Sequence, residues 1–418
     1  MGKVLLFWLV LCTALPAQWP PLPTPTEMPG QPFFIKNIWY IGGAGVWDSI
    51  TLDPATNRLY IAHGPMVQVV NIQTGALAGE IKGLRRAYAI ALDNTGQFGY
   101  VSDGGASHVV VFNRQSLETV ATIDTGPNPR SLVFEPRTHL LFVVQPAPPA
   151  QTFRPRGGGP ANASNLIPVS YPRSYVAVID TQNDKVVGEI LFRGELGQAE
   201  TDGAGNVYIS YLDRDAILRF NAGEIAAKLL HKTKEAAAAS ARKPVGSAPG
   251  QPPVLDWTGD PGSGAAAGDF ITLRLGPACG KPRGFAVDGP NARLFAACGN
   301  GVLDVLDTLT DQQVTTLPVG PAVEEVGYDP VHGLIFAPDG APNGCLTIIR
   351  YNAVTHSYNV IQNLPTRSRA YVMAVDPESG RVYLVTDIVG ADLTHHGGIG
   401  SLRMKPVEGS FQVLEIGD

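Results

Sequence analysis

Cationic side chains recur at a fixed place in the sequence, five or seven residues before an acidic residue that opens a turn. The cations at these offsets are Arg86, Arg130, Lys281, Arg283 and Arg369. The same offsets also hold Tyr88, Tyr371, Asp48, Glu195 and Glu324. Guanidinium groups that converge in a concave site bind carboxylate or phosphate through paired hydrogen bonds. If these positions meet, the sequence predicts an anion-binding site at the mouth of a channel. The alternative is that the cations pair with the nearby acids and only line a water-filled channel.

A second set of side chains has the atom types of metal ligands. These residues lie in the expected loops between second and third strands and comprise His63, Asp103, His108, Asp213, Asp215, Asp339 and Asp387, with His395 and His396 further along. Carboxylate and imidazole groups suit calcium or a transition metal. Their spacing is scattered, and aspartate before glycine is a common turn residue. We predict no cofactor and keep a divalent metal as the alternative.

The elements that position these residues follow from an internal repeat. An acidic residue, a short turn and a β-rich run recur seven times, at Asp53, Asp93, Glu135, Asp202, Asp288, Asp329 and Asp376. Most copies are separated by roughly 40 to 47 residues, which is the length of a propeller blade. The fold class is predicted to be all-β, a seven-bladed β-propeller whose equivalent loops meet around one pore.

One repeat divides into four strands, at 87–93, 97–103, 108–113 and 119–124. The last repeat has its third strand at 411–416, and residues 33–43 align with a fourth strand. We therefore expect four-stranded antiparallel blades, with the N-terminal strand closing the last blade. Such closure removes the free sheet edges of an open array.

Composition agrees with a turn-rich β protein. Glycine (47) and proline (35) make up about a fifth of the 418 residues, and only 16% are charged. The 44% of hydrophobic residues can bury a large core, which excludes disorder of the whole chain. A net charge of −6 argues against a nucleic-acid-binding protein, which normally has a basic excess.

The N-terminal residues have the features of an export signal. Lys3 precedes an apolar run at 4–12 and small residues up to Ala17, as in a secretory signal peptide. We predict a signal peptide at 1–17, a proline-rich tether at 18–32 and one propeller at 33–418, with insertions at 146–173, 222–268 and 387–410. A lipid anchor on Cys12 is the rival interpretation. The mature chain is expected to be periplasmic or extracellular, without a transmembrane segment.

Three cysteines remain after the predicted signal peptide. In the repeat register, Cys279 and Cys298 lie at adjoining ends of two antiparallel strands, so a disulfide between them is expected in an exported protein. Two buried free thiols are the alternative. Cys345 is expected to be a partly buried free thiol.

The repeats also resemble a known family. The runs RLYIA, FGYVSDG, VVNIQTG and RVYLVT are similar to those of the YVTN β-propeller family of exported proteins, over essentially the whole mature chain. The resemblance implies a seven-bladed scaffold or binding module outside the cytoplasm, and no catalytic motif comes with it. The three insertions depart from the family pattern.

The leading functional hypothesis is therefore binding without a reaction. The predicted ligand is an anionic small molecule, peptide or glycan at the channel mouth, with protein partners on the inserted loops. The alternative is an enzyme in the same channel, either a metal-dependent hydrolase or lactonase or a quinone-dependent oxidoreductase. Motifs of serine hydrolases, zinc proteases and P-loop proteins do not occur, so no catalytic residue is predicted.

Overall fold

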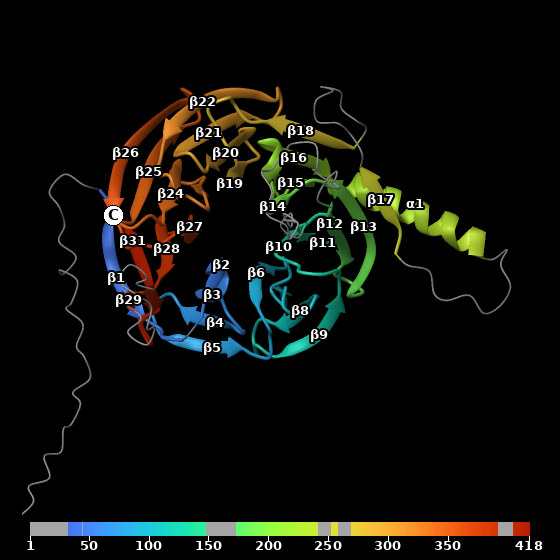
Figure 1. Ribbon diagram of the computed structural model, residues 1–418, viewed down its shortest axis with the longest axis horizontal. Coiled ribbons are helices and arrows are strands. Elements are labelled where there is room, and N and C mark those ends of the chain that lie inside the picture. The colour runs from blue at the N-terminus through green and yellow to red at the C-terminus, as the bar shows by residue number, and fades with distance from the viewer. Residues whose placement is uncertain (1–31, 44, 148–172, 241–251, 258–268, 392–403) are drawn as a thin grey trace, which may run out of the picture.

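The computed structural model describes residues 32–43, 45–147, 173–240, 252–257, 269–391 and 404–418. Within this part of the chain, seven β-sheets of four or five strands are arranged in a ring around a central axis (Figure 1). The predicted seven-bladed propeller is confirmed. The expected signal peptide, nearly all of the tether and of the loop 146–173, and the histidines at 395 and 396 lie outside the described residues.

The seven acidic residues that recur in the repeats are called the acidic anchors. The blades are numbered from the repeat that contains the first of them, Asp53. Blade 1 contains β2 (Trp47–Asp53), β3 (Arg58–His63), β4 (Met66–Asn71) and β5 (Leu77–Ile81). Blade 2 contains β6 (Ala87–Leu92), β7 (Phe98–Asp103), β8 (His108–Asn113) and β9 (Thr119–Asp124). Blade 3 contains β10 (Ser131–Glu135), β11 (Leu140–Gln145), β12 (Arg173–Asp180), β13 (Lys185–Arg193) and β17 (Val254–Trp257). Blade 4 contains β14 (Leu196–Thr201), β15 (Asn206–Tyr211), β16 (Ala216–Asn221) and β18 (Phe270–Arg274).

The remaining blades have the same order from the axis outward. Blade 5 contains β19 (Pro282–Asp288), β20 (Arg293–Cys298), β21 (Val302–Asp307) and β22 (Gln312–Pro318). Blade 6 contains β23 (Gly327–Asp329), β24 (Leu334–Asp339), β25 (Cys345–Asn352) and β26 (Ser357–Pro365). Blade 7 contains β27 (Val372–Asp376), β28 (Arg381–Thr386), β31 (Gln412–Gly417) and β1 (Phe34–Tyr40).

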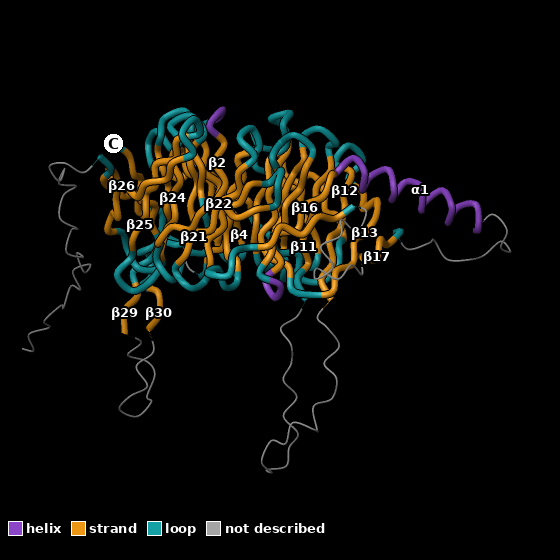
Figure 2. Tube along the Cα trace, turned by 90° about the horizontal axis from the view of Figure 1, so that it is seen from above, coloured by secondary structure: helices purple, strands orange, loops and turns teal. Residues whose placement is uncertain are grey.

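The other elements lie outside the blades. They are the 3-10 helices η1 (Pro54–Thr56) and η3 (Leu212–Arg214), the helix α1 (Ala222–Ser240), and the hairpin of β29 (Val389–Ala391) and β30 (Met404–Pro406). Figure 2 shows the ring edge-on, with α1 projecting from the rim and the hairpin on one face. None of the described helices is both long and apolar enough to cross a membrane.

The core lies between neighbouring blades. The second strand of every blade is buried along nearly its whole length, whereas outer strands such as β22 and β26 are largely exposed. Tyr60 of blade 1 and Phe112 of blade 2, for example, have ring centroids 5.6 Å apart within one apolar cluster. Each blade therefore buries its faces against two neighbours, and this is possible for all seven only in a closed ring.

The N-terminal strand completes this ring as predicted. β1 pairs antiparallel with β31, from Phe34 opposite Gly417 to Tyr40 opposite Gln412. The preceding residue, Phe33, is joined to blade 6 because the side chain of Gln362 exchanges two hydrogen bonds with its backbone, at 2.9 and 2.8 Å. The two ends of the chain thus share one sheet, and β1 supplies the fourth and outermost strand of blade 7.

The acidic anchors recur because they close the turn between the first and second strands. Asp93 Oδ1 accepts backbone hydrogen bonds from Gly96 and Phe98, and the carboxylate of Glu135 accepts them from Arg137 and Thr138. A carboxylate in this position satisfies turn N–H groups that would otherwise be unpaired. The anchors lie on the face opposite the predicted mouth.

The insertion at 222–268 contains a helix, as its sequence indicates, and a strand that was not predicted. α1 packs Ile225 and Leu229 against blades 3 and 4, and β17 then pairs parallel with β13, from Val254 opposite Glu189 to Trp257 opposite Phe192. This strand has only four residues, which is too short to show a period of two. It covers the outer edge of the nine-residue strand β13.

The predicted disulfide is present. Cys279 and Cys298 are bonded, with their Cα atoms 5.2 Å apart, and they join the loop before β19 to the end of β20. Cys345 is free and half-buried at the start of β25. Burial raises the pKa of its thiol, and the carboxylate of Asp339 raises it further.

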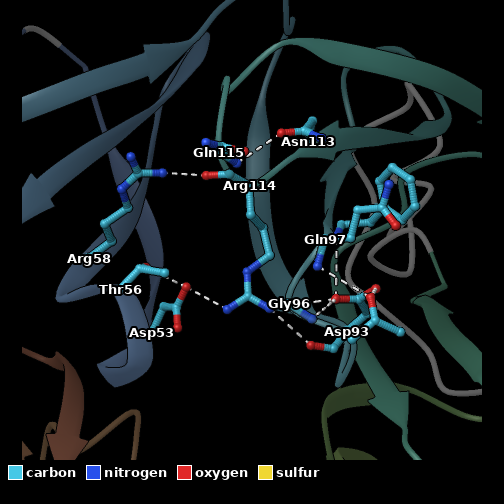
Figure 3. A network of polar contacts seen from close by, with 11 residues as sticks. Asp53, Thr56, Arg58, Asp93, Gly96, Gln97, Asn113, Arg114 and Gln115 are labelled. Carbon is cyan, nitrogen blue, oxygen red and sulfur yellow. Dashed lines mark hydrogen bonds and ion pairs between the residues drawn. The ribbon is translucent and has the colours of Figure 1, made fainter.

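A buried ion pair ties blade 1 to blade 2 (Figure 3). Arg114 Nη2 lies 2.5 Å from Asp53 Oδ2, and its Nη1 lies 3.5 Å from Asp93 Oδ1 and donates to the Asp93 carbonyl at 3.1 Å. Burial raises the pKa of Asp53, but hydrogen bonds from Arg114 and Thr56 outweigh it and leave the pKa below its ordinary value. One guanidinium thus forms ion pairs with the anchors of two blades.

We expect Arg114→Met to lower the free energy of unfolding by about 3–5 kcal/mol, because it leaves the buried Asp53 carboxylate without its cation. Urea unfolding followed by circular dichroism measures this. The same exchange at the exposed Arg350 should change stability by less than about 0.5 kcal/mol. Equal effects at the two positions would contradict the assigned role of Arg114.

Candidate functional site

The central channel consists of two connected cavities. One of about 620 Å³ lies toward the acidic anchors, and one of about 350 Å³ lies toward the opposite face. The first strands of the blades form their walls, because these strands stand nearest the axis (Figure 1). The two cavities share a waist that includes Ile50, Ile90, Leu132, Glu200 and Glu325.

The smaller cavity opens at the predicted mouth. Five of the residues proposed from the sequence line it, and they come from blades 1, 2, 3, 4 and 6: Asp48, Tyr88, Arg130, Glu195 and Glu324. They meet because each lies at the same place in its repeat, where the chain enters an innermost strand. These five residues and the side chains in contact with them are called the mouth.

Tyr88 forms the centre of the cationic side of the mouth. Its ring is buried, and the guanidinium carbons of Arg86 and Arg130 each lie 4.6 Å from its centroid. Arg130 Nη2 is also 3.4 Å from the Tyr88 hydroxyl. Cations on an aromatic face are held without losing their hydrogen-bond donors, so both guanidinium groups can still bind an anion.

Asp48 interacts both with the arginines of the mouth and with one of its acidic residues. Its carboxylate lies 3.7 Å from Arg86 Nη2. Burial raises the pKa of Asp48 to about 6, with Arg86 and Arg130 lowering it and Glu324 raising it. Since these charges act on Asp48 from three other blades, blades 1, 2, 3 and 6 share one electrostatic environment.

The other predicted cations differ in whether they already have a carboxylate partner. Arg283 Nη1 lies 3.7 Å from Glu324 Oε1, with both side chains half exposed. Arg369 Nη1 lies 3.4 Å from Asp387 Oδ1. Among the described residues, no carboxylate lies within ion-pair distance of Arg130. The alternative of cations paired with neighbouring acids thus applies to Arg86, Arg283 and Arg369 but leaves Arg130 available.

The two predicted residues that remain, Tyr371 and Lys281, lie at the margin of the mouth and outside it. Tyr371 stacks on Trp47 with centroids 6.0 Å apart, and Arg369 lies over the same indole at 4.8 Å. Burial raises the pKa of Tyr371 to about 12, so it is a neutral hydrogen-bonding group. Lys281 is exposed and does not line the cavity; its backbone N–H donates to Asp215 at 2.8 Å, which holds it above the junction of blades 4 and 5.

Most of the candidate metal ligands instead close loops. Asp103, Asp213, Asp215 and Asp339 all accept backbone N–H hydrogen bonds. His108 lies 3.6 Å from Asp103 Oδ2. Within the described residues there is no group of three or more histidine, cysteine, aspartate or glutamate side chains that could hold a metal ion.

Two carboxylates at the channel waist were missed from the sequence. Glu200 of β14 accepts a hydrogen bond from Gln198 at 2.8 Å, and Glu325 accepts one from the Met373 N–H at 2.5 Å. Burial raises the pKa of Glu200 to about 7 and that of Glu325 to about 8, and the charge of Glu200 contributes to the second shift. Glu200 lies two residues before its anchor, where four other repeats have alanine or valine, and this contrast is the signal that could have revealed it.

These two pKa shifts predict how stability depends on pH. Between about pH 5 and pH 8 the folded chain holds protons on Glu200 and Glu325 that the unfolded chain has released, so the free energy of unfolding falls as pH rises and then levels off. We expect thermal unfolding to show a lower midpoint at pH 8.5 than at pH 6.

The double variant Glu200→Gln, Glu325→Gln carries no charge at the waist at any pH. Its midpoint should vary less over the same range and exceed that of the parent chain at pH 8.5. Parallel pH curves for the two proteins would show that the waist carboxylates do not cause the dependence.

Comparison with known proteins supports the fold. The sequence matches no family model and no curated protein. Among solved structures, the chain is similar to U3-55K (9% identity, 92% of this chain and 98% of that chain, TM-score 0.59) and to the RRP9 WD40 repeats (9%, 94% and 99%, TM-score 0.59). A chain in a structure of a mitotic checkpoint complex is also similar (13%, 97% and 99%, TM-score 0.57). At these identities the likeness shows the propeller fold alone.

Proposed function

We propose that this propeller is a binding protein that holds an anionic ligand at the mouth of its channel. The observation that carries the proposal is Arg130, a cation oriented by the face of Tyr88 that has no carboxylate partner among the described residues. Arg86 lies on the same ring and supplies a second guanidinium. Two such groups can hold one carboxylate, phosphate or sulfate group with charge-assisted hydrogen bonds.

The remaining charges at the mouth favour a small ligand or a short acidic segment. The cavity of about 350 Å³ is at the lower end of the range for small-molecule sites. Glu195 and Glu324 occupy the arc that the arginines leave, so a second negative charge is favoured only on the side of blades 2 and 3. An anionic metabolite, or an acidic side chain of a peptide or glycan, meets this requirement.

We also propose that the protein works outside the cytoplasm. The features of residues 1–17 support export, and so does the disulfide between Cys279 and Cys298, because such bonds persist in oxidising compartments. The resemblance of the repeats to the YVTN family belongs to the same proposal. A rigid ring of this kind requires no reaction to function as a scaffold, since its loops present ligand groups from five blades to one point.

Sulfate is a suitable probe of the mouth because it keeps its charge over the tested pH range. Binding to the native state raises the unfolding midpoint, and we expect Arg130→Glu to shift the saturable part of the rise to higher sulfate concentrations. The loss of affinity should be about tenfold or more, as for a hydrogen bond to a charged group. Arg350→Glu, at an exposed position of blade 6, keeps the same net charge and controls for general salt effects. A sulfate response identical in the two variants would remove the mouth from consideration.

The pKa of Asp48 predicts that sulfate binds more tightly in acid. Above about pH 6 the Asp48 carboxylate is ionised and competes for Arg86, and below it the carboxyl is neutral. Sulfate affinity measured by calorimetry should therefore rise between pH 7.5 and pH 5. In Asp48→Asn we expect higher affinity at pH 7.5 and a smaller change with pH than in the parent chain. An unchanged pH dependence in this variant would assign the effect to another group.

A further inference from the structure

The charged side chains at the mouth include two ion pairs and two groups that remain unpaired. Each ion pair has an N–O distance of 3.7 Å, and the pairs are Arg86 with Asp48 and Arg283 with Glu324. Arg130 and Glu195 line the same cavity, and among the described residues neither has a partner of opposite charge within ion-pair distance. One cation and one anion are therefore left over at the mouth.

Glu195 is held by its backbone, and its carboxylate is left without a partner. The N–H of Glu195 donates to Asp213 at 3.0 Å, and its carbonyl accepts from the Leu212 N–H at 2.8 Å. The residue is exposed, and no donor in the described part of the chain forms a hydrogen bond with its carboxylate. The loop therefore fixes the place of the carboxylate and leaves its oxygens available to a donor from the cavity.

Arg130 and Glu195 come from neighbouring blades. Arg130 directly precedes β10, and Glu195 directly precedes β14. These innermost strands lie side by side, since the Ala199 N–H donates to Ser131 Oγ at 2.9 Å. The two charged side chains thus reach the cavity from adjacent places on its rim without forming an ion pair with each other. Opposite charges held apart at one cavity are complementary to a ligand that carries both a cationic and an anionic group.

Aliphatic side chains also line this cavity. They come from the first strands of blades 1, 2, 3 and 7 and are Ile50, Ile90, Leu132 and Val372. Their contact with an apolar group of a ligand removes apolar surface from water. The cavity volume of about 350 Å³ limits the ligand to a small molecule. A short aliphatic body that carries both charges at one end meets these conditions.

Several other polar side chains of the wall already have partners in the protein. Thr51 donates to the Ile90 carbonyl at 2.8 Å, and Gln198 accepts from the Phe285 N–H at 3.0 Å. The acids Glu200 and Glu325 lie at the waist, where each accepts a hydrogen bond from the protein. At the mouth itself, the side chains that lack an ionic partner are therefore those of Arg130 and Glu195 within the described chain.

We propose that the mouth binds a zwitterionic α-amino acid, with its carboxylate at Arg130, its ammonium at Glu195 and an aliphatic side chain against the apolar wall. This assignment rests on the anion site proposed above and specifies its ligand. The amino acid completes the charge pairing that the two ion pairs of the mouth already show. A carboxylate without an ammonium would leave Glu195 unpaired and place a second negative charge near it.

Leucine is the test ligand, and two analogues of similar shape each lack one of its charges. Isocaproate has the carboxylate without the ammonium, and isopentylammonium has the ammonium without the carboxylate. In calorimetric titrations of the full chain at pH 7.5, we expect leucine to bind about tenfold or more tightly than either analogue, as for an added hydrogen bond between charged groups.

Glu195→Gln separates recognition of the ammonium from a general effect of negative charge. Leucine should bind this variant about tenfold more weakly, because its ammonium loses a charged acceptor. Isocaproate should bind it more tightly, because an acid that repels the carboxylate is removed. A general charge effect would move both compounds in the same direction, since both carry a carboxylate. Glu118→Gln makes the same charge change at an exposed turn on the opposite face and should alter neither affinity.

Arg130→Gln tests the anion site separately. It should weaken the binding of leucine, isocaproate and sulfate, and it should not weaken that of isopentylammonium. If all three anionic probes bind this variant as they bind the parent chain, the anion site and the amino-acid assignment both fail. If isocaproate or sulfate is weakened, the anion site stands. The amino-acid assignment alone is then overturned by leucine that shows no saturable binding, binds no more tightly than isocaproate, or is not weakened by Glu195→Gln.

Discussion

The burial of each blade between two neighbours is the constraint on which the structure depends. Second strands such as β20 and β24 have no exposed residue, and their side chains pack into clusters shared by adjacent blades. An open row of such sheets leaves one face of each terminal blade exposed unless a cap covers it, whereas a closed ring leaves none exposed. The pairing of β1 with β31 provides the closure, and it brings equivalent residues of all seven repeats to one axis.

Closure has a direct chemical consequence, because it concentrates charge where the repeats meet. A charged residue at the entrance of an innermost strand faces its counterparts from other blades rather than open solvent. Asp48 thereby interacts with arginines of blades 2 and 3 and with Glu324 of blade 6. At the waist, burial raises the pKa of Glu200 and Glu325, and the charge of Glu200 adds to the shift of Glu325. The ring thus determines both where an anion is favoured and where protons are retained.

The architecture was predictable because the sequence pattern of one blade recurs seven times. Each acidic anchor such as Asp93 closes a turn by local hydrogen bonds, so its spacing reports the blade directly. Position within the repeat also predicted that Asp48, Tyr88 and Arg130 would lie near one another, whereas Lys281 lies outside the cavity. Pairing within the mouth was not predictable: Arg130 and Arg86 look alike in the sequence, and only the structure shows that Arg86 has Asp48 beside it.

Features that belong to one repeat alone were beyond sequence reasoning. The strand β17 depends on an edge left by a long β13, and the partnership of Arg369 with Asp387 depends on an insertion without a counterpart in other blades. Asp387 resembles a turn residue in the sequence, and its burial is visible only in the folded loop. The sequence repeat predicts the strands and loops that all blades share. Contacts that occur in only one blade are visible only in the three-dimensional structure.

The central claim is that the arginines of separate blades form one anion site at the channel mouth. Crystals grown or soaked with selenate test it directly, since the anomalous signal of selenium locates the anion without reference to any assumed pose. The account predicts a strong peak within hydrogen-bonding distance of Arg130, on the side of the mouth that Arg86 also faces. Selenate found only on the outer rim or among the anchor turns, with none at Arg130, would contradict it.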